Sequence, residues 1–238
     1  MKLSIIIPVF NEEKTILEIL RRVRDVKTPS IDKEIIVVND GSQDRTLKFV
    51  NDFSLRNPKI KVLNQSENQG KGAAVRAGIK ESTGDYILIQ DADLEYNPKD
   101  INRLISPIIE NRAMVVYGTR LKRLPSFSRD ERTPLFLLHY MGNRFLSFLT
   151  SILYGQWITD METCYKLFPR SAVKDMNLNA KGFEFEPEIT AKLLKKGYSI
   201  FEVPIATSPR GYDEGKKLNT FKDGVIALWT LIKYRFLD

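Results

Sequence analysis

The sequence has almost none of the residues that build disulfides or zinc sites. Its 238 residues include one cysteine, Cys164, and one histidine, His139. A single cysteine excludes an internal disulfide and any zinc site made of several cysteines, and it is typical of a reducing compartment. With one histidine in the chain, we expect no zinc site built from protein ligands alone.

Long apolar runs are also missing. A membrane-spanning helix needs about 18 or more consecutive apolar residues, and no run in the sequence reaches that length. The nearest is 133–155, which His139, Asn143 and Arg144 interrupt. The apolar run after Met1 and Lys2 is short and soon acidic, unlike a signal peptide. We therefore expect neither a transmembrane helix nor a signal peptide.

The signatures of several nucleotide-binding and nucleic-acid-binding classes are absent. No GxGxxG follows the first apolar run, which disfavours a Rossmann dehydrogenase, and no GxxxxGK[ST] indicates a P-loop NTPase. The chain also lacks a known nucleic-acid-binding motif and a platform of aromatic and basic residues. These absences favour other classes of protein, and we expect no nucleic-acid partner.

Positive charge is in excess, but only in the second part of the chain. The formal net charge is +7; residues 1–100 carry 16 Lys and Arg against 16 Asp and Glu, and residues 101–238 carry 21 against 14. This imbalance indicates an anionic partner such as a phosphorylated molecule, a membrane surface or nucleic acid. A solvated basic surface without a partner is the alternative.

Short runs rich in Ile and Val alternate with segments of helical periodicity. The predicted strands are 3–9, 34–38, 61–64, 86–90 and 114–118, followed later by 199–205. Amphipathic helices are predicted between them, for example over 12–24, where Ile16, Ile19, Leu20 and Val23 share one face. Strands with little polar alternation are covered on both faces. We therefore predict an α/β fold with a mostly parallel central sheet and helices on both faces.

The chain shows no repeat and no low-complexity linker, so we expect one domain over 1–238. Within it, the alternating pattern of strands and helices covers 1–119, and the chain changes character over 120–238. Further helices are predicted over 133–155, 186–196 and 219–236. Four predicted strands end in polar segments, namely 8–13, 38–44, 64–72 and 90–96. Because ligands gather at the carboxyl ends of parallel strands, these segments mark the expected site.

The segment 90–96 places three carboxylates two residues apart, at Asp91, Asp93 and Glu95. Residues two apart in a strand lie on one face about 6.6–6.8 Å apart, so we expect Asp91 and Asp93 to face one way, with Glu95 following where the chain begins to turn. Carboxylates this close repel each other unless a cation or a proton compensates. Mg²⁺ or Mn²⁺ suits such oxygen ligands and keeps positions for substrate phosphates. A solvated acidic turn that caps the next helix is the alternative.

Four segments in this order and spacing, PVFNEE, VVNDGSQDRT, NQGKGAAVRAG and QDADLEY, resemble family 2 glycosyltransferases of the GT-A fold. The later segments DMETCYKLF, FEFEPEITAKLLKKGY and EVPI resemble the branch that makes dolichyl- or undecaprenyl-phosphate sugars. The resemblance implies an inverting, metal-dependent enzyme. Such an enzyme moves glucose or mannose from a UDP- or GDP-sugar to a polyprenyl phosphate.

The resemblance also implies a nucleotide-sugar-binding half over 1–119, an acceptor-binding half over 120–238 and roles for individual residues. The nucleotide-sugar would be held by Pro8, Phe10, Asn11, Glu12, Asp40, Gly70, Lys71, Gly72 and Asp91. Asp91, Asp93 and Glu95 would be metal ligands, and Asp91, Asp93 and Arg120 would be catalytic. The family usually has Asp where this chain has Asn39, which leaves the base preference open.

A phosphate acceptor changes what the enzyme must supply. A phosphate monoester is mostly dianionic at neutral pH, so it needs a cationic cradle rather than a general base. By resemblance, the acceptor phosphate would be bound by Arg120, Arg132, Arg210 and Lys217. Arginine suits this task because its planar fork binds two phosphate oxygens. Surface salt bridges are the alternative for each of them. If the acceptor is instead a saccharide or protein hydroxyl, Asp160 is the candidate base.

The predicted helix over 133–155 is apolar nearly all round. Such a helix is buried in the core, lies in a homodimer interface or contacts a membrane surface. Beside the basic stretch 120–132, it favours peripheral contact with anionic lipid headgroups. We therefore expect a cytoplasmic protein on the inner face of a membrane, with a homodimer as a further possibility.

Overall fold

The computed structural model describes residues 1–28, 31–120, 134–208 and 220–237. Within them, one seven-stranded sheet forms the centre, in the order β3-β2-β1-β4-β6-β5-β7. Its strands are β1 Lys2–Val9, β2 Asp32–Asp40, β3 Ile60–Gln65, β4 Tyr86–Ile89, β5 Val115–Thr119, β6 Lys166–Pro169 and β7 Ile200–Pro204. All neighbours are parallel except β6, which pairs antiparallel with β4 and with β5. The predicted α/β fold is confirmed.

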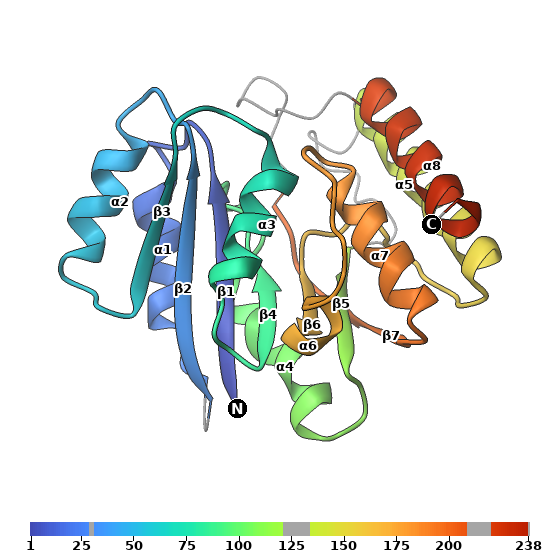
Figure 1. Cartoon of the computed structure of the whole chain (residues 1–238), viewed down its shortest axis with the longest axis horizontal. Coiled ribbons are helices and arrows are strands. Elements are labelled where there is room, and N and C mark those ends of the chain that lie inside the picture. The colour runs from blue at the N-terminus through green and yellow to red at the C-terminus, as the bar shows by residue number, and fades with distance from the viewer. Residues whose placement is uncertain (29–30, 121–133, 209–219, 238) are drawn as a thin grey trace.

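Helices cover both faces of this sheet. The α-helices are α1 Ile16–Asp25, α2 Thr46–Ser54, α3 Lys71–Glu81, α4 Ile101–Ile109, α5 Pro134–Tyr154, α6 Arg170–Val173, α7 Phe185–Lys195 and α8 Thr220–Phe236, and η1 Pro98–Asp100 is a 3₁₀ turn. In Figure 1, α3 lies in front of β1 and α1 lies behind the sheet. The connection from β3 to β4 therefore returns across the face opposite to α1.

The strands form where the sequence is continuously apolar. In β1, all residues from Leu3 to Val9 are buried, which matches a strand covered on both faces. In α1, the predicted stripe of Ile16, Ile19, Leu20 and Val23 is fully buried against the sheet. These apolar faces build one continuous core under the carboxyl ends of the strands.

The strand β6 is absent from our sequence prediction. It has only four residues and includes a lysine, Lys166, which is fully buried. Lys166 and Pro169 leave only Leu167 and Phe168 between them, so the segment lacks the Ile- and Val-rich run that marked the other strands. Its antiparallel direction also breaks the regular alternation on which the prediction rested.

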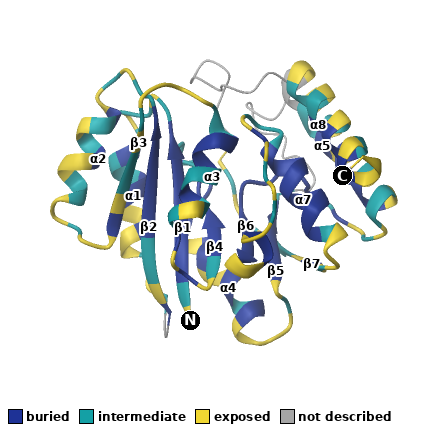
Figure 2. Ribbon diagram, in the orientation of Figure 1, coloured by how far each residue is buried: buried dark blue, intermediate teal, exposed yellow. Residues whose placement is uncertain are grey.

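At one end of the molecule, α5 and α8 lie side by side and pack against α7 (Figure 1). Both helices expose large apolar side chains, among them Phe145 and Phe148 on α5 and Val225 and Trp229 on α8. Figure 2 shows exposed residues along the outer side of this pair. None of the described helices is both long enough and apolar enough to cross a membrane.

Candidate active site

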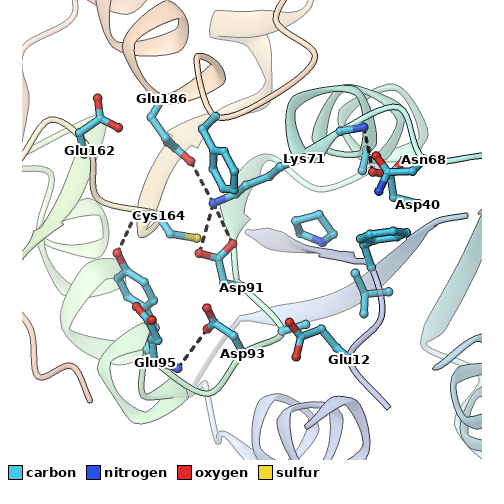
Figure 3. Close-up of a pocket in the computed structure, with 18 of the residues that line it drawn as sticks. Glu12, Asp40, Asn68, Lys71, Asp91, Asp93, Glu95, Glu162, Cys164 and Glu186 are labelled. Carbon is cyan, nitrogen blue, oxygen red and sulfur yellow. Dashed lines mark hydrogen bonds and ion pairs between the residues drawn. The ribbon is translucent and has the colours of Figure 1, made fainter. Parts of the chain in front are cut away.

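A cavity of about 370 Å³ opens at the carboxyl ends of β1, β2 and β4. Ten residues predicted from the sequence line it: Pro8, Phe10, Glu12, Asp40, Gly70, Lys71, Asp91, Asp93, Glu95 and Arg120. Figure 3 shows Lys71 and Asp91 near the middle, with Asp40 and Asn68 on one side and Glu162 and Glu186 on the other. The topology of the sheet therefore brings these separate segments to one place.

Asn11 and Gly72 were predicted to bind the nucleotide, but they are not among the residues that line the cavity. The Asn11 side chain accepts a hydrogen bond from the backbone of Gln43 at 2.8 Å and so ties the β1 loop to the β2 loop. The backbone N–H of Gly72 donates to Gly182 at 3.2 Å. Direct contact of either residue with a nucleotide stays a prediction.

Asp40 shapes the loop that precedes α3. Its two carboxylate oxygens accept hydrogen bonds from the backbone N–H groups of Gln69 and Gly70, at 2.8 and 2.9 Å. Gly70 has φ = +98°, a conformation that suits glycine. Asp40 therefore holds the backbone beside Lys71 in place while its side chain also lines the cavity.

The three acids Asp91, Asp93 and Glu95 lie in a turn, because β4 ends at Ile89. Our expectation of an extended strand with two carboxylates on one face is wrong here. The turn includes Leu94 at φ = +66°, and the Asp93 carboxylate accepts a hydrogen bond from the backbone of Glu95 at 3.1 Å. Within the described residues, no three His, Cys, Asp or Glu side chains gather into a metal-binding group.

These acids nevertheless fit a divalent cation that shares its ligands with a substrate. Mg²⁺ in nucleotide enzymes is commonly held by one or two carboxylates plus phosphate oxygens. Asp91 and Asp93 line the same cavity and offer hard oxygen ligands at its centre. Glu95 as a third ligand stays a prediction.

Two lysines and two carboxylates form a chain of ion pairs that begins at Asp91 and runs into the buried interior. The Lys71 ammonium lies 2.8 Å from Asp91 and 3.3 Å from Glu186, and Lys166 lies 2.7 Å from the other oxygen of Glu186. Burial alone would lower the pKa of Lys71, but the neighbouring carboxylates, Asp91 above all, hold it well above its usual value. Lys71 is therefore a permanent cation beside Asp91.

Arg120 is bound to Asp160 by a two-pronged ion pair. Its Nε and Nη2 atoms each donate to the Asp160 carboxylate at 2.8 Å. Burial favours the neutral acid, but Arg120 outweighs it and keeps the pKa of Asp160 below its usual value. Asp160 is fully buried and also accepts a hydrogen bond from Asn143. Such a carboxylate is a poor general base, which weakens the alternative in which Asp160 activates a hydroxyl.

Comparisons with known proteins agree with this geometry. The family model described as glycosyl transferase family 2 matches residues 4–176. The chain belongs to this family. As a family 2 glycosyltransferase, it contains in one cavity the polar segments on which our sequence resemblance rested.

Two relatives match nearly the whole glycosyltransferase chain. A dolichyl-phosphate beta-glucosyltransferase of Trichomonas vaginalis is 30% identical over 98% of this chain and 71% of its own length. A UDP-N-acetylglucosamine–dolichyl-phosphate N-acetylglucosaminyltransferase of Methanococcus voltae is 32% identical over 90% of this chain and 89% of its own.

Among solved structures, a glucosyl-3-phosphoglycerate synthase of Mycobacterium tuberculosis is similar with a TM-score of 0.74. It was crystallised with Mn²⁺, UDP-glucose and glycerol 3-phosphate. It is 18% identical, and the match covers 100% of this chain and 81% of that one. This likeness concerns the fold, and the predicted GT-A fold is confirmed.

Sequence reasoning missed several residues that line the glycosyltransferase's cavity, including His139, Glu162, Phe183 and Glu186. Glu162 and Glu186 lie in segments that we linked to the polyprenyl-phosphate branch, but nothing in their spacing points to a cavity. Their partners come from distant elements, so only the folded chain brings them to the site.

Three residues predicted to bind the acceptor phosphate, Arg132, Arg210 and Lys217, lie outside the described residues. Arg120 is the one predicted acceptor-binding residue that the structure describes, and it lines the cavity. Two of its guanidinium N–H groups donate to Asp160. Since a guanidinium carries five N–H donors, the others can serve a second anion.

Proposed function

We propose that this glycosyltransferase moves a hexose from a UDP- or GDP-sugar to a polyprenyl phosphate, with inversion at the anomeric carbon. The observation that carries the proposal is the nearly full-length match to two relatives whose names both specify dolichyl phosphate. The division of labour predicted from the sequence supports it, with a donor half over 1–119 and an acceptor half over 120–238.

The donor nucleotide is proposed to lie along the ends of β1 and β2. Pro8, Phe10 and Asp40 line that side of the cavity. Its diphosphate would reach Asp91 and Asp93 at the end of β4. A Mg²⁺ or Mn²⁺ ion bound there would offset the charge that develops on the departing nucleoside diphosphate. Lys71 keeps Asp91 oriented toward this position.

The acceptor phosphate is proposed to enter beside Arg120. A dianionic phosphate oxygen is already a nucleophile, so the site needs positioning and positive charge rather than a base. Arg120 forms an ion pair with Asp160, the residue predicted as the general base for a hydroxyl acceptor. This ion pair makes Asp160 a poor base, which supports a phosphate acceptor.

We further propose that the enzyme contacts the membrane peripherally through the exposed apolar residues of α5 and α8. These side chains recur every three or four positions, as Met141, Phe145 and Phe148 do on α5. A polyprenyl chain must leave the bilayer close to the cavity, and this face lies at the acceptor end of the molecule. A homodimer through the same face is the alternative, and placement on the cytoplasmic side stays a prediction.

The assay is incubation with a panel of UDP- and GDP-sugars, Mg²⁺ or Mn²⁺, and short polyprenyl phosphates, followed by mass spectrometry of the lipid. We expect a glycolipid from one donor class. We also expect Asp93→Ala to abolish metal-dependent binding of the nucleotide, measured by calorimetry, without changing the circular dichroism spectrum.

The matched control is Asp52→Ala, which removes an exposed carboxylate on α2, away from the cavity. It should leave nucleotide binding and turnover unchanged. Full turnover by Asp93→Ala would reject its proposed role in the site. Transfer to saccharide or protein hydroxyls, with none to polyprenyl phosphate, would reject the proposed acceptor.

A further inference from the structure

Glu162 occupies a junction between two cavities. It lies in the loop between α5 and β6 and lines the main cavity at the end opposite to Asp40 (Figure 3). It also lines a smaller cavity of about 50 Å³, together with residues of α5 and α8 such as Asn143 and Ala227. The side chain therefore lies between the helix pair and the proposed reaction centre.

The carboxyl of Glu162 is unsatisfied within the described part of the chain. Its Oε1 atom is buried and has no hydrogen-bond partner there. Leaving a buried polar atom unpaired costs about 1–3 kcal/mol. Native structures rarely retain such an atom without a reason, and a ligand that pairs with it is one such reason. The position of Glu162 in the lining of the cavity makes a ligand the natural partner.

The surroundings of Glu162 favour its neutral form. The pKa of Glu162 is raised to about 7, with burial as the largest cause. That value already includes the influence of Glu186 and Asp160, which raise the pKa, and of Lys166 and Arg120, which lower it. The ionisable groups around it come from every neighbouring element, namely Arg120 after β5, His139 on α5, Asp160 in the same loop, Lys166 on β6, Glu186 on α7 and Asp223 on α8.

The nearby cations are engaged by other carboxylates. Lys71 is paired with Asp91 and Glu186, and Arg120 with Asp160. An incoming phosphate carries close to two negative charges at neutral pH, so it would be repelled by an ionised Glu162. A protonated carboxyl removes that repulsion and supplies an O–H donor.

We propose that Glu162 binds the acceptor phosphate as a neutral carboxylic acid, donating a hydrogen bond from its O–H to a phosphate oxygen, so that acceptor binding takes up a proton. No covalent bond to Glu162 forms or breaks, and the proton returns to solvent when the product leaves. The inference rests on the proposed function, because it assigns a role toward that acceptor.

The deciding variant is Glu162→Gln, which has nearly the same shape, is always neutral and keeps a hydrogen-bond donor. For the unmodified enzyme, the acceptor KM should rise above pH 7, approaching about tenfold per pH unit. The second ionisation of the acceptor phosphate, with a pKa of about 6, is nearly complete above pH 7, so it contributes little to this rise in KM. In Glu162→Gln, the KM should be flat from about pH 7 to 8.5, with kcat within about threefold of the unmodified enzyme.

If Glu162 is instead a general base, Glu162→Gln should lose about 10²–10⁴-fold in kcat, and that result would overturn the inference. Nucleotide binding and the melting temperature of the variant show whether it is folded. Glu18→Gln, an exposed change on α1, is the matched control and should keep the unmodified pH profile. A variant KM that still rises with pH would also overturn the inference.

Proton uptake gives a readout that is independent of turnover. Calorimetry with a short polyprenyl phosphate and a nucleoside diphosphate, in buffers of different ionisation enthalpy near pH 7.5, should show uptake by the unmodified protein and none by Glu162→Gln. Equal uptake by both would overturn the inference. An unmodified enzyme that glycosylates no polyprenyl phosphate would reject the proposed function, whereas an active enzyme with an inactive Glu162→Gln rejects only this inference.

Discussion

Lys71 and Lys166 alternate with Asp91 and Glu186 in the site, and each charge has an opposite neighbour; Lys166 and Glu186 are buried, and Lys71 and Asp91 partly so. An isolated buried charge is costly, and removing one partner of a buried pair typically costs about 3–5 kcal/mol. The chain therefore holds the Asp91 carboxylate in one orientation before any substrate arrives. A preset site of this kind avoids reorganisation at the moment of reaction.

Glu34 on β2 is a second carboxylate with several partners, far from the cavity. It accepts hydrogen bonds from Ser4 at 2.5 Å and from Thr83 at 2.7 and 2.8 Å, and it pairs with Lys2 at 2.8 Å. Burial opposes ionisation, but these donors outweigh it and lower the pKa of Glu34 to about 2. Its folded-state pKa is below the unfolded value, so its stabilisation is complete above about pH 4.5 and is lost as pH falls toward 2.

We therefore expect Glu34→Gln to lower the free energy of unfolding at pH 7 by about 1–3 kcal/mol, since the group is partly solvated. Urea titrations between pH 2 and 7 should also show a shallower loss of stability toward acid for the variant. Glu67→Gln, at an exposed position, is the control. If the stability of Glu34→Gln fell between pH 7 and pH 2 as steeply as that of the unmodified protein, this prediction would be contradicted.

At the scale of elements, the direction of β6 determines which loop reaches the cavity. Because β6 runs antiparallel to β4 and β5, its first residue lies at their carboxyl ends. The loop before it therefore enters the cavity and carries Asp160 and Glu162. Lys166 shapes this loop, because its ammonium donates to the backbone carbonyls of Met161 and Thr163, at 2.8 and 2.5 Å.

The first residues of α3 pack directly against the segment before α7. A Cβ added to Gly70 would lie 2.4 Å from the backbone oxygen of Lys181. We expect Gly70→Ala to lower the free energy of unfolding by about 1–3 kcal/mol, because both the positive φ and the contact disfavour a side chain. Nucleotide affinity should fall as well, since the next residue, Lys71, lines the cavity and would be displaced. Chemical denaturation and calorimetry measure the two effects.

Gly142→Ala is the matched control, since this glycine lies within α5 and a Cβ there would meet nothing within 4 Å. Alanine should raise helix stability by about 0.5–1 kcal/mol. Equal stability of the two variants would show that the backbone at Gly70 adapts, contrary to our expectation.

At the scale of the whole molecule, the apolar face of α5 and α8 stands at one end, and the ends of β1 and β2, where we propose that the donor binds, lie toward the other (Figure 1). Exposed apolar patches of this kind mark interfaces with membranes or proteins. The positive excess of residues 101–238 favours an anionic membrane.

We expect the double variant Phe148→Glu, Trp229→Glu to lose about tenfold or more in binding to vesicles of mixed neutral and anionic phospholipid, measured by flotation. Both side chains are exposed, so the fold should be unaffected. Turnover of a short, water-soluble polyprenyl phosphate should stay the same, because the reaction centre is unchanged.

Leu55→Glu is the control, since Leu55 is 85% exposed at the end of α2, away from this face. It should leave vesicle binding unchanged. Light scattering of the unmodified protein tests the alternative. A dimer that Phe148→Glu, Trp229→Glu dissociates, without any vesicle binding, would assign this face to self-association.

Much of the fold was predictable because its signals are local. Continuous apolar runs such as Leu3–Val9 indicated buried strands, and the stripe of α1 indicated its buried face. Polar segments after the strands located the cavity, since parallel strands bring their carboxyl ends to one edge. The extended geometry assumed for Asp91 and Asp93 failed, because a turn begins where β4 ends.

The sequence by itself determined the α/β class, the family and the polar segments that line the cavity, because each depends on neighbours along the chain. Only the tertiary structure decided that Lys71 forms an ion pair with Asp91, that Arg120 forms one with Asp160 and that Glu162 lines the cavity. Those contacts join distant segments, and they exist because the short antiparallel strand β6 inserts between β4 and β5. The physical reason is that local sequence patterns determine the type and the buried face of each helix or strand. The order of the strands in the sheet determines which charged side chains come into contact.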